Sequence, residues 1–243
     1  MALRSFLEGE LFAEVYGEGP PGVLALHGWG RRGNDFAAVF DGYSGIAPDL
    51  PGFGASPAPE SAIGADAYAD IVAKMLDSFD EPPVVVGHSF GGRVAVCLAA
   101  KHPERVGPLV LTGVPLIRLE TGRQPSPAYR LARWLNRVGV LSDERMEREK
   151  RRRGSDDYRA VSGVMRDILV KVVNETYEGQ LMRISVSVQM LWGERDEEVP
   201  LSVAEAAQAL IPDSSLEVLH GVGHFVPLEA PGALRAAIER AMA

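Results

Sequence analysis

A serine at the predicted junction of a strand and a helix is the residue of this chain best suited to chemistry. In PPVVVGHSFGGRVAV, residues 82–96, three consecutive valines predict a buried strand, and the small apolar residues after Ser89 predict a buried helix. Gly87 and Gly91 complete a G-x-S-x-G pattern, and glycines leave room for so tight a turn. The pattern predicts a serine hydroxyl held clear of the backbone, where it can act as a nucleophile.

A serine hydroxyl becomes an effective nucleophile only when a base takes its proton and an acidic side chain orients that base. His224 lies in the glycine-rich loop HGVGHFVPLEAP, directly after the last predicted strand, and Asp196 lies in LWGERDEEVP, directly after the strand before it. The chain order Ser89, Asp196, His224 is therefore nucleophile, acid, base. Since parallel strands share their carboxyl edge, we expect all three side chains to meet there.

The elements that must position these residues alternate along the chain. Besides the strand before Ser89, strands are predicted in segments 3–19 (two strands), 21–28, 43–56, 106–113, 186–193 and 215–221. Helices are predicted after Ser89 and in segments 64–79, 201–211 and 229–243. Strands that alternate with helices predict an α/β fold whose sheet is mostly parallel, with helices on both faces.

Residues 115–183 interrupt this alternation with helical patterns and no predicted strand. The segment holds 15 of the 25 Lys and Arg residues but only 10 of the 33 Asp and Glu residues. We expect it to be a helical insert that passes over the carboxyl edge of the sheet, where open α/β folds bind ligands. Its amphipathic spacing makes Trp134 and Met165 candidates for the wall of a substrate pocket.

Five motifs, in this order and spacing, resemble those of the α/β-hydrolase superfamily: HGWG, DLPGFGAS, VVVGHSFGG, LWGERDEEVP and GVGHFVPLEAP. The chain looks most like lidded serine carboxylesterases, and its HGWG and GHSFGG motifs are also similar to the methyl-ester esterases of biotin synthesis. The resemblance implies an eight-stranded α/β-hydrolase fold with a cap inserted after the sixth strand. It thus implies a core of residues 1–114 and 184–243 and a helical cap (lid) of residues 115–183.

The resemblance also implies roles for single residues. The backbone N–H groups of Trp29 and Phe90 would form an oxyanion hole, which stabilises the charge that develops on the substrate oxygen. His27 would brace the loop that carries Trp29. The family's G-x-x-D spacing from Gly193 selects Asp196 as the acid among several neighbouring carboxylates. The competing residues are Glu194, Glu197 and Glu198.

Composition and charge exclude several other classes. A net charge of −8 and a pI near 5.2 argue against a nucleic-acid-binding protein. The single Cys97 cannot form an internal disulfide, and its place in the predicted helix after Ser89 indicates an inert core thiol. No signal peptide or run of about 20 apolar residues is present, so we expect a cytoplasmic protein without a membrane partner. The Cys and His spacings predict no metal site, and no cofactor is implied.

These features favour a serine hydrolase that cleaves carboxylic esters of small molecules through an acyl-enzyme. C–C bond hydrolases, lyases, perhydrolases and acyltransferases use the same fold and triad, so they stay open as alternatives. A ligand-binding receptor with the hydrolase fold, or a scaffold with an inactive site, is less compatible with a complete triad. The basic balance of the insert is a weak indication of an anionic substrate. The acyl group, the alcohol group and the oligomeric state are not determined by the sequence.

Overall fold

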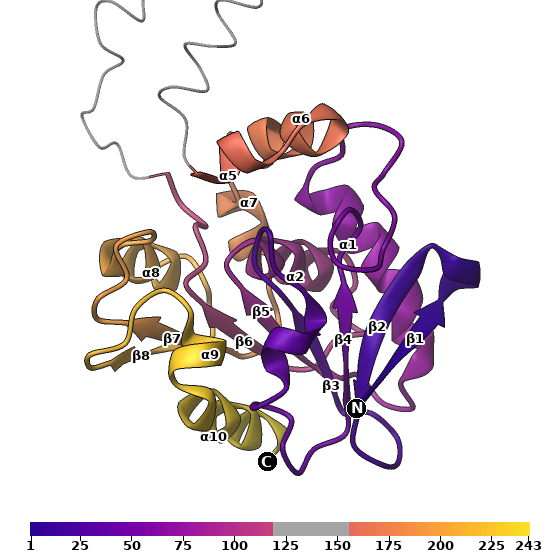
Figure 1. Ribbon diagram of the computed structural model, residues 1–243. Coiled ribbons are helices and arrows are strands. Elements are labelled where there is room, and N and C mark those ends of the chain that lie inside the picture. The colour runs from indigo at the N-terminus through magenta and orange to yellow at the C-terminus, as the bar shows by residue number, and fades with distance from the viewer. Residues whose placement is uncertain (119–155) are drawn as a thin grey trace, which may run out of the picture.

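The computed structural model describes residues 1–118 and 156–243, and an eight-stranded sheet forms its centre (Figure 1). The strand order is β1-β2-β4-β3-β5-β6-β7-β8. β2 is antiparallel to β1 and β4, and the other neighbours pair in parallel. The predicted mostly parallel sheet of eight strands is confirmed. The strands are β1 (Ala2–Phe6), β2 (Leu11–Tyr16), β3 (Val23–Leu26), β4 (Gly45–Asp49), β5 (Val84–His88), β6 (Leu109–Thr112), β7 (Val188–Gly193) and β8 (Ser214–Leu219).

The central strands β3, β5 and β6 are buried along their whole length. Both faces of a parallel sheet are covered by helices, so its inner strands need continuous apolar runs rather than alternation. The pairing of Val23 with Val84 and of Val85 with Leu109 aligns these runs across the sheet. As a result, β5 ends at His88 in the middle of the carboxyl edge, and Ser89 follows it directly.

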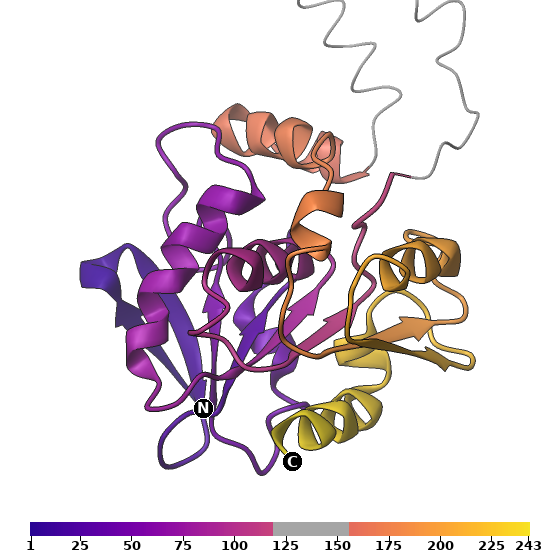
Figure 2. The same ribbon diagram turned by 180° about the vertical axis from the view of Figure 1, so that it is seen from behind.

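Helices cover the sheet from both sides. α1 (Ala65–Ala73), α2 (Phe90–Lys101) and α8 (Leu201–Gln208) pack on the face that is turned to the viewer in Figure 2. The opposite face carries α10 (Pro231–Met242), α9 (Val226–Glu229) and the 3-10 turn η2 (Gly33–Phe36). The predicted helix 64–79 is α-helical only to Ala73 and continues as the tighter 3-10 helix η3 (Lys74–Ser78). A further 3-10 turn, η1 (Leu7–Gly9), joins β1 to β2.

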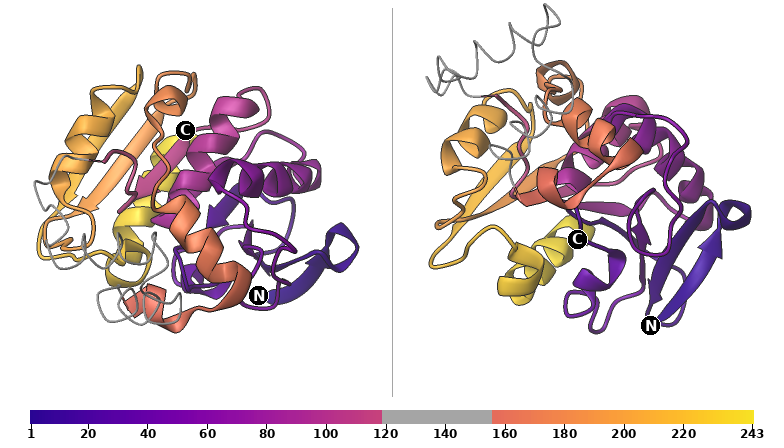
Figure 3. Two further views of the ribbon diagram at one scale, coloured as in Figure 1. Left: turned by 90° about the horizontal axis from the view of Figure 1, so that it is seen from above. Right: turned by 45° about the horizontal axis from the view of Figure 1, so that its top comes forward.

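The described part of the insert forms three helices, α5 (Asp156–Ala160), α6 (Gly163–Val172) and α7 (Glu178–Leu181). α6 lies across the carboxyl edge of the strands, as the view from above shows (Figure 3, left). Trp134 falls in 119–155, outside the described residues. In the part of the insert that can be compared, helices stand where the sequence predicts helices.

α6 is anchored to the core rather than standing away from it. Ile168 and Val172 are almost completely buried, and the buried Arg93 of α2 donates a 2.6 Å hydrogen bond from Nη1 to the Val172 carbonyl. Just after α6, the carboxylate of Glu175 accepts a 3.1 Å hydrogen bond from the N–H of Ala65, the first residue of α1. α6 therefore forms a fixed roof above the sheet edge.

The burial of Cys97 and the length and hydropathy of the helices are two further features of the described residues. Cys97 is buried in α2, and burial raises the pKa of its thiol to about 12, as expected for the inert core thiol that the sequence predicts. None of the helices in 1–118 and 156–243 is both long and apolar enough to span a bilayer.

Candidate active site

Ser89 stands at a strained turn between β5 and α2. Its backbone has φ 50° and ψ −114°, a left-handed conformation that residues with a Cβ seldom adopt. The N–H of Ser89 donates a 2.9 Å hydrogen bond to the carbonyl of Thr112 on β6, which holds the turn to the sheet. A Cβ at Gly91 would overlap the carbonyl oxygen of Leu26 on β3, so only glycine lets α2 approach this closely. The strain therefore lifts the Ser89 side chain above the sheet edge.

His224 and Asp196 form a buried pair beside this turn. His224 Nδ1 lies 2.8 Å from Asp196 Oδ2, and the two side chains are 6% and 1% exposed. Asp196 Oδ1 accepts hydrogen bonds from the N–H groups of Glu198 (3.0 Å) and Val199 (2.8 Å), which fix the carboxylate in place. An ionised carboxylate at Nδ1 selects the tautomer that carries its proton there. In that tautomer Nε2 of His224 carries no proton, so it is able to take one from a neighbouring group.

Ser89 and His224 line one cavity of about 100 Å³, which we call the polar cavity. The hydroxyl and the imidazole, both in the described part of the chain, share it without a direct hydrogen bond. Catalytic hydrogen bonds are often long in the free state and tighten when substrate binds. The structure thus brings together the three residues predicted from the sequence. The polar cavity is lined by Gly28, Trp29, Arg31, His88, Ser89, Glu198, His224 and Phe225.

Gly113 leaves room for the His224–Asp196 pair and was not singled out from the sequence. It follows β6 with φ 57°, and a Cβ there would lie 2.9 Å from His224 Nδ1 and 3.2 Å from Asp196 Oδ2. Both the backbone conformation and the space exclude other residues. The only signal in the sequence is a glycine at the end of a predicted strand, in LTGVP. Its importance is visible only once β7 pairs with β6, and β8 with β7, which brings Asp196 and His224 next to it.

The two predicted oxyanion donors flank Ser89. Phe90 is the first residue of α2, so its N–H has no acceptor within the helix. Trp29 follows β3 in the loop that lines the same cavity. Among the residues that the structure describes, neither N–H donates a hydrogen bond. Two free N–H groups beside a nucleophile are the geometry that stabilises an oxyanion.

His27 braces the loop that carries Trp29, as the resemblance implies. Its Nδ1 lies 2.7 Å from the carbonyl oxygen of Gly28, and its Nε2 accepts a 2.9 Å hydrogen bond from the N–H of Leu50. These two bonds require the neutral ring with its proton on Nδ1. Burial lowers the pKa of His27 to about 4, so the ring stays neutral and ties the loop after β3 to the end of β4.

His88 is a second buried histidine beside the pair. Its ring centroid lies 4.9 Å from that of His224, and its Nδ1 lies 3.0 Å from the hydroxyl of Thr112. Burial, with the neighbouring His224 as a smaller cause, lowers the pKa of His88 to about 3. His88 is therefore a neutral wall of the site at physiological pH.

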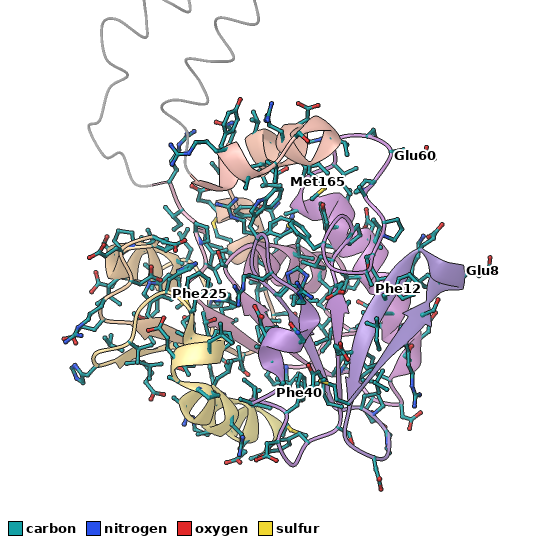
Figure 4. The ribbon with its side chains drawn as sticks, in the orientation of Figure 1. Glu8, Phe12, Phe40, Glu60, Met165 and Phe225 are labelled. Atoms are coloured by element: carbon teal, nitrogen blue, oxygen red, sulfur yellow. The ribbon has the colours of Figure 1, made fainter. Side chains whose placement is uncertain are left out.

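A second cavity of about 160 Å³ is lined by Ser89 and by residues of α6, and we call it the apolar cavity. Sequence reasoning did not name most of its wall. Met165, the described candidate, instead packs over Gly52 from the underside of α6 (Figure 4). Its role as a pocket residue stays a prediction. The apolar cavity is lined by Trp29, Ser89, Phe90, Arg93, Pro115, Leu169, Val172, Val173, Glu198 and Val199.

The side chains and backbone groups of this site include those that the sequence predicts for acyl transfer. Within residues 1–118 and 156–243, no cluster of three or more His, Cys, Asp and Glu side chains is arranged to hold a metal ion. A nucleophile, a base with its orienting acid and two oxyanion donors are the components of acyl transfer.

Comparison with known proteins gives relatives of several activities. The pimeloyl-[acyl-carrier protein] methyl ester esterase of Chromobacterium violaceum is 44% identical over 117 residues, 46% of this chain and 44% of that relative. The chain is thus matched to less than half the length of that esterase. A 2-hydroxy-6-oxononadienedioate/2-hydroxy-6-oxononatrienedioate hydrolase of Cupriavidus pinatubonensis is 25% identical over 241 residues, 88% of this chain and 83% of that relative.

The fold is shared with solved structures. The thioesterase domain from the curacin biosynthetic pathway has a TM-score of 0.72 at 20% identity and covers 98% of both chains. The family model described as the alpha/beta hydrolase family matches residues 23–237, which include every residue of the site described above. Together with the eight-stranded sheet and its helices, this match shows that the chain belongs to the alpha/beta hydrolase family of enzymes.

Proposed function

We propose that this chain is a serine hydrolase that cleaves carboxylic esters of small molecules through an acyl-enzyme. In this proposal Ser89 is the nucleophile, His224 the general base and acid, and Asp196 the residue that orients His224. The observation that carries the proposal is the buried His224–Asp196 pair, 2.8 Å apart, facing the cavity that Ser89 also lines. Of the two relatives compared above, the one with the higher identity is named as an ester-cleaving enzyme.

The first half of the reaction forms the acyl-enzyme. Ser89 Oγ attacks the ester carbonyl carbon while His224 Nε2 takes its proton, and the carbonyl electron pair moves onto oxygen. The N–H groups of Trp29 and Phe90 donate to this oxyanion. When the carbonyl re-forms, the bond to the alkoxy oxygen breaks, and His224 returns the proton to that oxygen. The alcohol leaves, and Ser89 carries the acyl group.

The second half releases the acid. His224 Nε2 takes a proton from a water molecule as the water oxygen attacks the acyl carbon. Collapse of this second tetrahedral intermediate breaks the bond to Ser89 Oγ, which regains its proton from His224. Asp196 stays ionised throughout and stabilises the imidazolium form of His224 in both halves. The products are one alcohol and one carboxylic acid, and the enzyme is restored.

The division of the chain is part of the same proposal. Residues 1–114 and 184–243 form the hydrolase core, and residues 115–183 form a cap that controls substrate choice. The support is the position of α6, whose residues Leu169 and Val172 line the apolar cavity next to Ser89. The apolar cavity accepts the acyl chain in this scheme. Trp134 and Met165 stay candidates for further cap contacts, and a cytoplasmic location stays a prediction of the sequence.

Cleavage of a carbon–carbon bond is the second candidate. One observation favours it: the relative from Cupriavidus pinatubonensis, a 2-hydroxy-6-oxononadienedioate/2-hydroxy-6-oxononatrienedioate hydrolase, matches over 88% of this chain. An assay of the wild-type protein with that relative's substrates beside p-nitrophenyl esters separates the two. Faster turnover of that relative's substrates than of the p-nitrophenyl esters would show that carbon–carbon bond cleavage, rather than ester cleavage, is the main activity.

Labelling of Ser89 tests the proposed function. A fluorophosphonate probe should label the wild-type chain at Ser89, as located by mass spectrometry, and Ser89→Ala should not be labelled. Hydrolysis of p-nitrophenyl butyrate should fall by on the order of a million-fold in Ser89→Ala. Ser78→Ala, which changes an exposed serine on η3, is the matched control and should keep both properties. Near-normal activity in a folded Ser89→Ala protein would rule out the serine-hydrolase mechanism.

A further inference from the structure

Only one of the two cavities is lined by His224, the general acid of the proposed mechanism. This difference determines which cavity takes which half of an ester. Ser89 lines both cavities, whereas His224 lines only the polar one. His224 must pass its proton to the leaving oxygen, and proton transfer needs hydrogen-bond distance. The alcohol half of the ester therefore belongs in the polar cavity, and the acyl half lies below α6. This assignment rests on the proposed function.

Glu198 lies where the alcohol must pass. Glu198 lines both cavities, and its Oε2 lies 3.6 Å from His224 Nε2, the ring nitrogen that does not face Asp196. The backbone N–H of Glu198 is bound to Asp196 Oδ1, so the acid of the pair also fixes the backbone from which Glu198 projects. Its side chain is 58% exposed, so the carboxylate is open to a ligand. Glu198 therefore presents a hydrogen-bond acceptor beside the leaving oxygen.

Arg31 presents donors to the same cavity. Its Nε donates to Asp35 at 2.5 Å, and its guanidinium lies over the ring of Phe225 with Cζ 5.4 Å from the centroid. These two contacts orient the guanidinium, and a guanidinium has further N–H groups on its Nη atoms. The polar cavity thus contains an oriented donor group, an anchored acceptor and the aromatic rings of Trp29 and Phe225.

The carboxylate of Glu198 and the guanidinium of Arg31 restrict which alcohols the polar cavity can bind. A purely apolar alcohol would remove water from a carboxylate and a guanidinium and offer no hydrogen bond in return. A cationic alcohol would lie close to Arg31, and an anionic one close to Glu198. A neutral alcohol with additional hydroxyl groups satisfies both, because each hydroxyl can donate to a carboxylate and accept from a guanidinium.

We propose that Glu198 is a specificity-determining residue that accepts a hydrogen bond from a second hydroxyl of the alcohol, and that the preferred substrates are esters of small polyols such as glycerol. Sequence reasoning treats Glu198 as one of three interchangeable neighbours of Asp196. The structure separates it from Glu197, which is exposed like Glu198 but lines neither cavity. Glu197 therefore provides a matched control at the next position of the chain.

Two esters with one acyl chain test the proposal: 1-glyceryl butyrate and propyl butyrate, which differ by two hydroxyl groups. In the wild-type chain we expect kcat/KM for the glyceryl ester to exceed that for the propyl ester about tenfold or more, as for a hydrogen bond to a charged group. Glu198→Leu should lower this ratio about tenfold, and Glu197→Leu should leave it unchanged. Two charged esters complete the set. The butyrate ester at the hydroxyl of 3-hydroxypropionate has an anionic alcohol half, and the butyrate ester of 3-aminopropanol has a cationic one. Both should have a lower kcat/KM than the glyceryl ester.

The outcomes distinguish this inference from the proposed function. Hydrolysis of the propyl ester as fast as the glyceryl ester by the wild-type chain would overturn the polyol proposal and leave the esterase intact. An equal loss on both esters in Glu198→Leu would also overturn it, because Glu198 would then act through His224 rather than on the alcohol. If Glu198→Leu fails to fold, the wild-type ranking of the four alcohols decides. Cleavage of none of these esters would remove the proposed function and the inference together.

Discussion

The floor and the roof of the site hold their side chains in different ways. The floor is the carboxyl edge of β5, β6 and β7 with the loop after β8, and it carries Ser89, Asp196 and His224. Ser89 is fixed by its backbone conformation, Asp196 by two backbone N–H groups, and His224 by the Asp196 carboxylate. The roof is α6, which contributes Leu169 and Val172 and is held by burial of its apolar face. Chemistry needs atoms fixed to a fraction of an ångström, whereas a cavity wall needs only the right volume.

One buried arginine joins the two regions. Arg93 of α2 donates to the carbonyl oxygens of Pro115 (3.2 Å) and Val172 (2.6 Å) and lies over the ring of Tyr177. Burial lowers the pKa of its guanidinium. Pro115 is the first residue of the insert and Val172 lies near its return, so Arg93 ties both arms of the insert to the core. The comparison of floor and roof predicts unequal effects of substitution, which the following experiments test.

Substitution of the acid on the floor should have the largest effect. Asp196→Asn should lower kcat for p-nitrophenyl butyrate by on the order of ten-thousand-fold, because an amide favours the wrong tautomer of His224. Glu197→Gln, a change of the same kind at the next residue, should cost less than twofold. Steady-state kinetics on both variants measure this difference. A tolerant Asp196 beside a sensitive Glu197 would show that the floor is assigned to the wrong carboxylate.

Substitution of Gly113, the glycine next to His224 and Asp196, should have the next largest effect on kcat. Gly113→Ala places a methyl group 2.9 Å from His224 Nδ1, so the ring must move, and we expect kcat to fall by on the order of a hundredfold. Gly163→Ala has nearly the same φ, 56°, but nothing within 4 Å of its Cβ. It therefore reports the cost of backbone strain alone. Comparable kcat in the two variants would mean that Gly113 serves the backbone and not the catalytic pair.

Two buried histidines beside the site, His27 and His88, should make the free energy of unfolding depend on pH. His27 has a pKa of about 4 in the folded chain, against about 6.5 when unfolded, so the unfolded state binds more protons between these values. The stabilisation is complete above about pH 6.5 and is lost as the pH falls toward 4. At pH 5 the loss is about 2 kcal/mol for His27, and His88 adds a loss of the same sign.

Urea unfolding at pH 7, 6 and 5 measures this dependence. His27→Asn should flatten the decrease in the free energy of unfolding between pH 7 and pH 5. His220→Asn, which changes a side chain that is 86% exposed, should leave the slope as it is in the wild type. Equal stability of the wild-type chain at pH 7 and pH 5 would contradict the assignment of His27 as a buried neutral residue.

Substitutions in the roof should have the smallest effect. They should change the preference between acyl chains of different length. Val173, directly after α6, lines the apolar cavity, whereas Val170, within α6, does not. The two side chains are similarly exposed, at 50% for Val173 and 44% for Val170. Val173→Ala should lower the ratio of kcat/KM for hexanoate over acetate esters about fivefold, because only the longer chain loses contact. Val170→Ala should keep the wild-type ratio. A Val173→Ala ratio that matches the wild type would show that the acyl chain does not lie under α6.

Much of the floor could be predicted from the sequence because its parts are local. A run of valines, a serine between glycines, and acidic and histidine residues directly after strands are each visible within a few residues. The eight strands lie where their apolar patterns indicate, and the inner ones are buried because parallel sheets are covered on both faces. Of the two predicted oxyanion donors, Phe90 could be placed from its position at the start of the helix after Ser89, whereas Trp29 was accessible only through resemblance.

What the sequence by itself determined is which residues follow the strands: Ser89 after β5, Asp196 after β7 and His224 after β8. Only the tertiary structure decided how they face one another. The strand order places β6 between β5 and β7, and this makes Gly113 the floor under His224. It also decided that Asp196 meets Nδ1 of His224 while Glu198 approaches Nε2, although only one residue lies between the two carboxylates in the chain. The physical reason is that hydrophobic periodicity fixes which residues are buried, whereas the contacts between loop side chains depend on the order and twist of the strands that carry them.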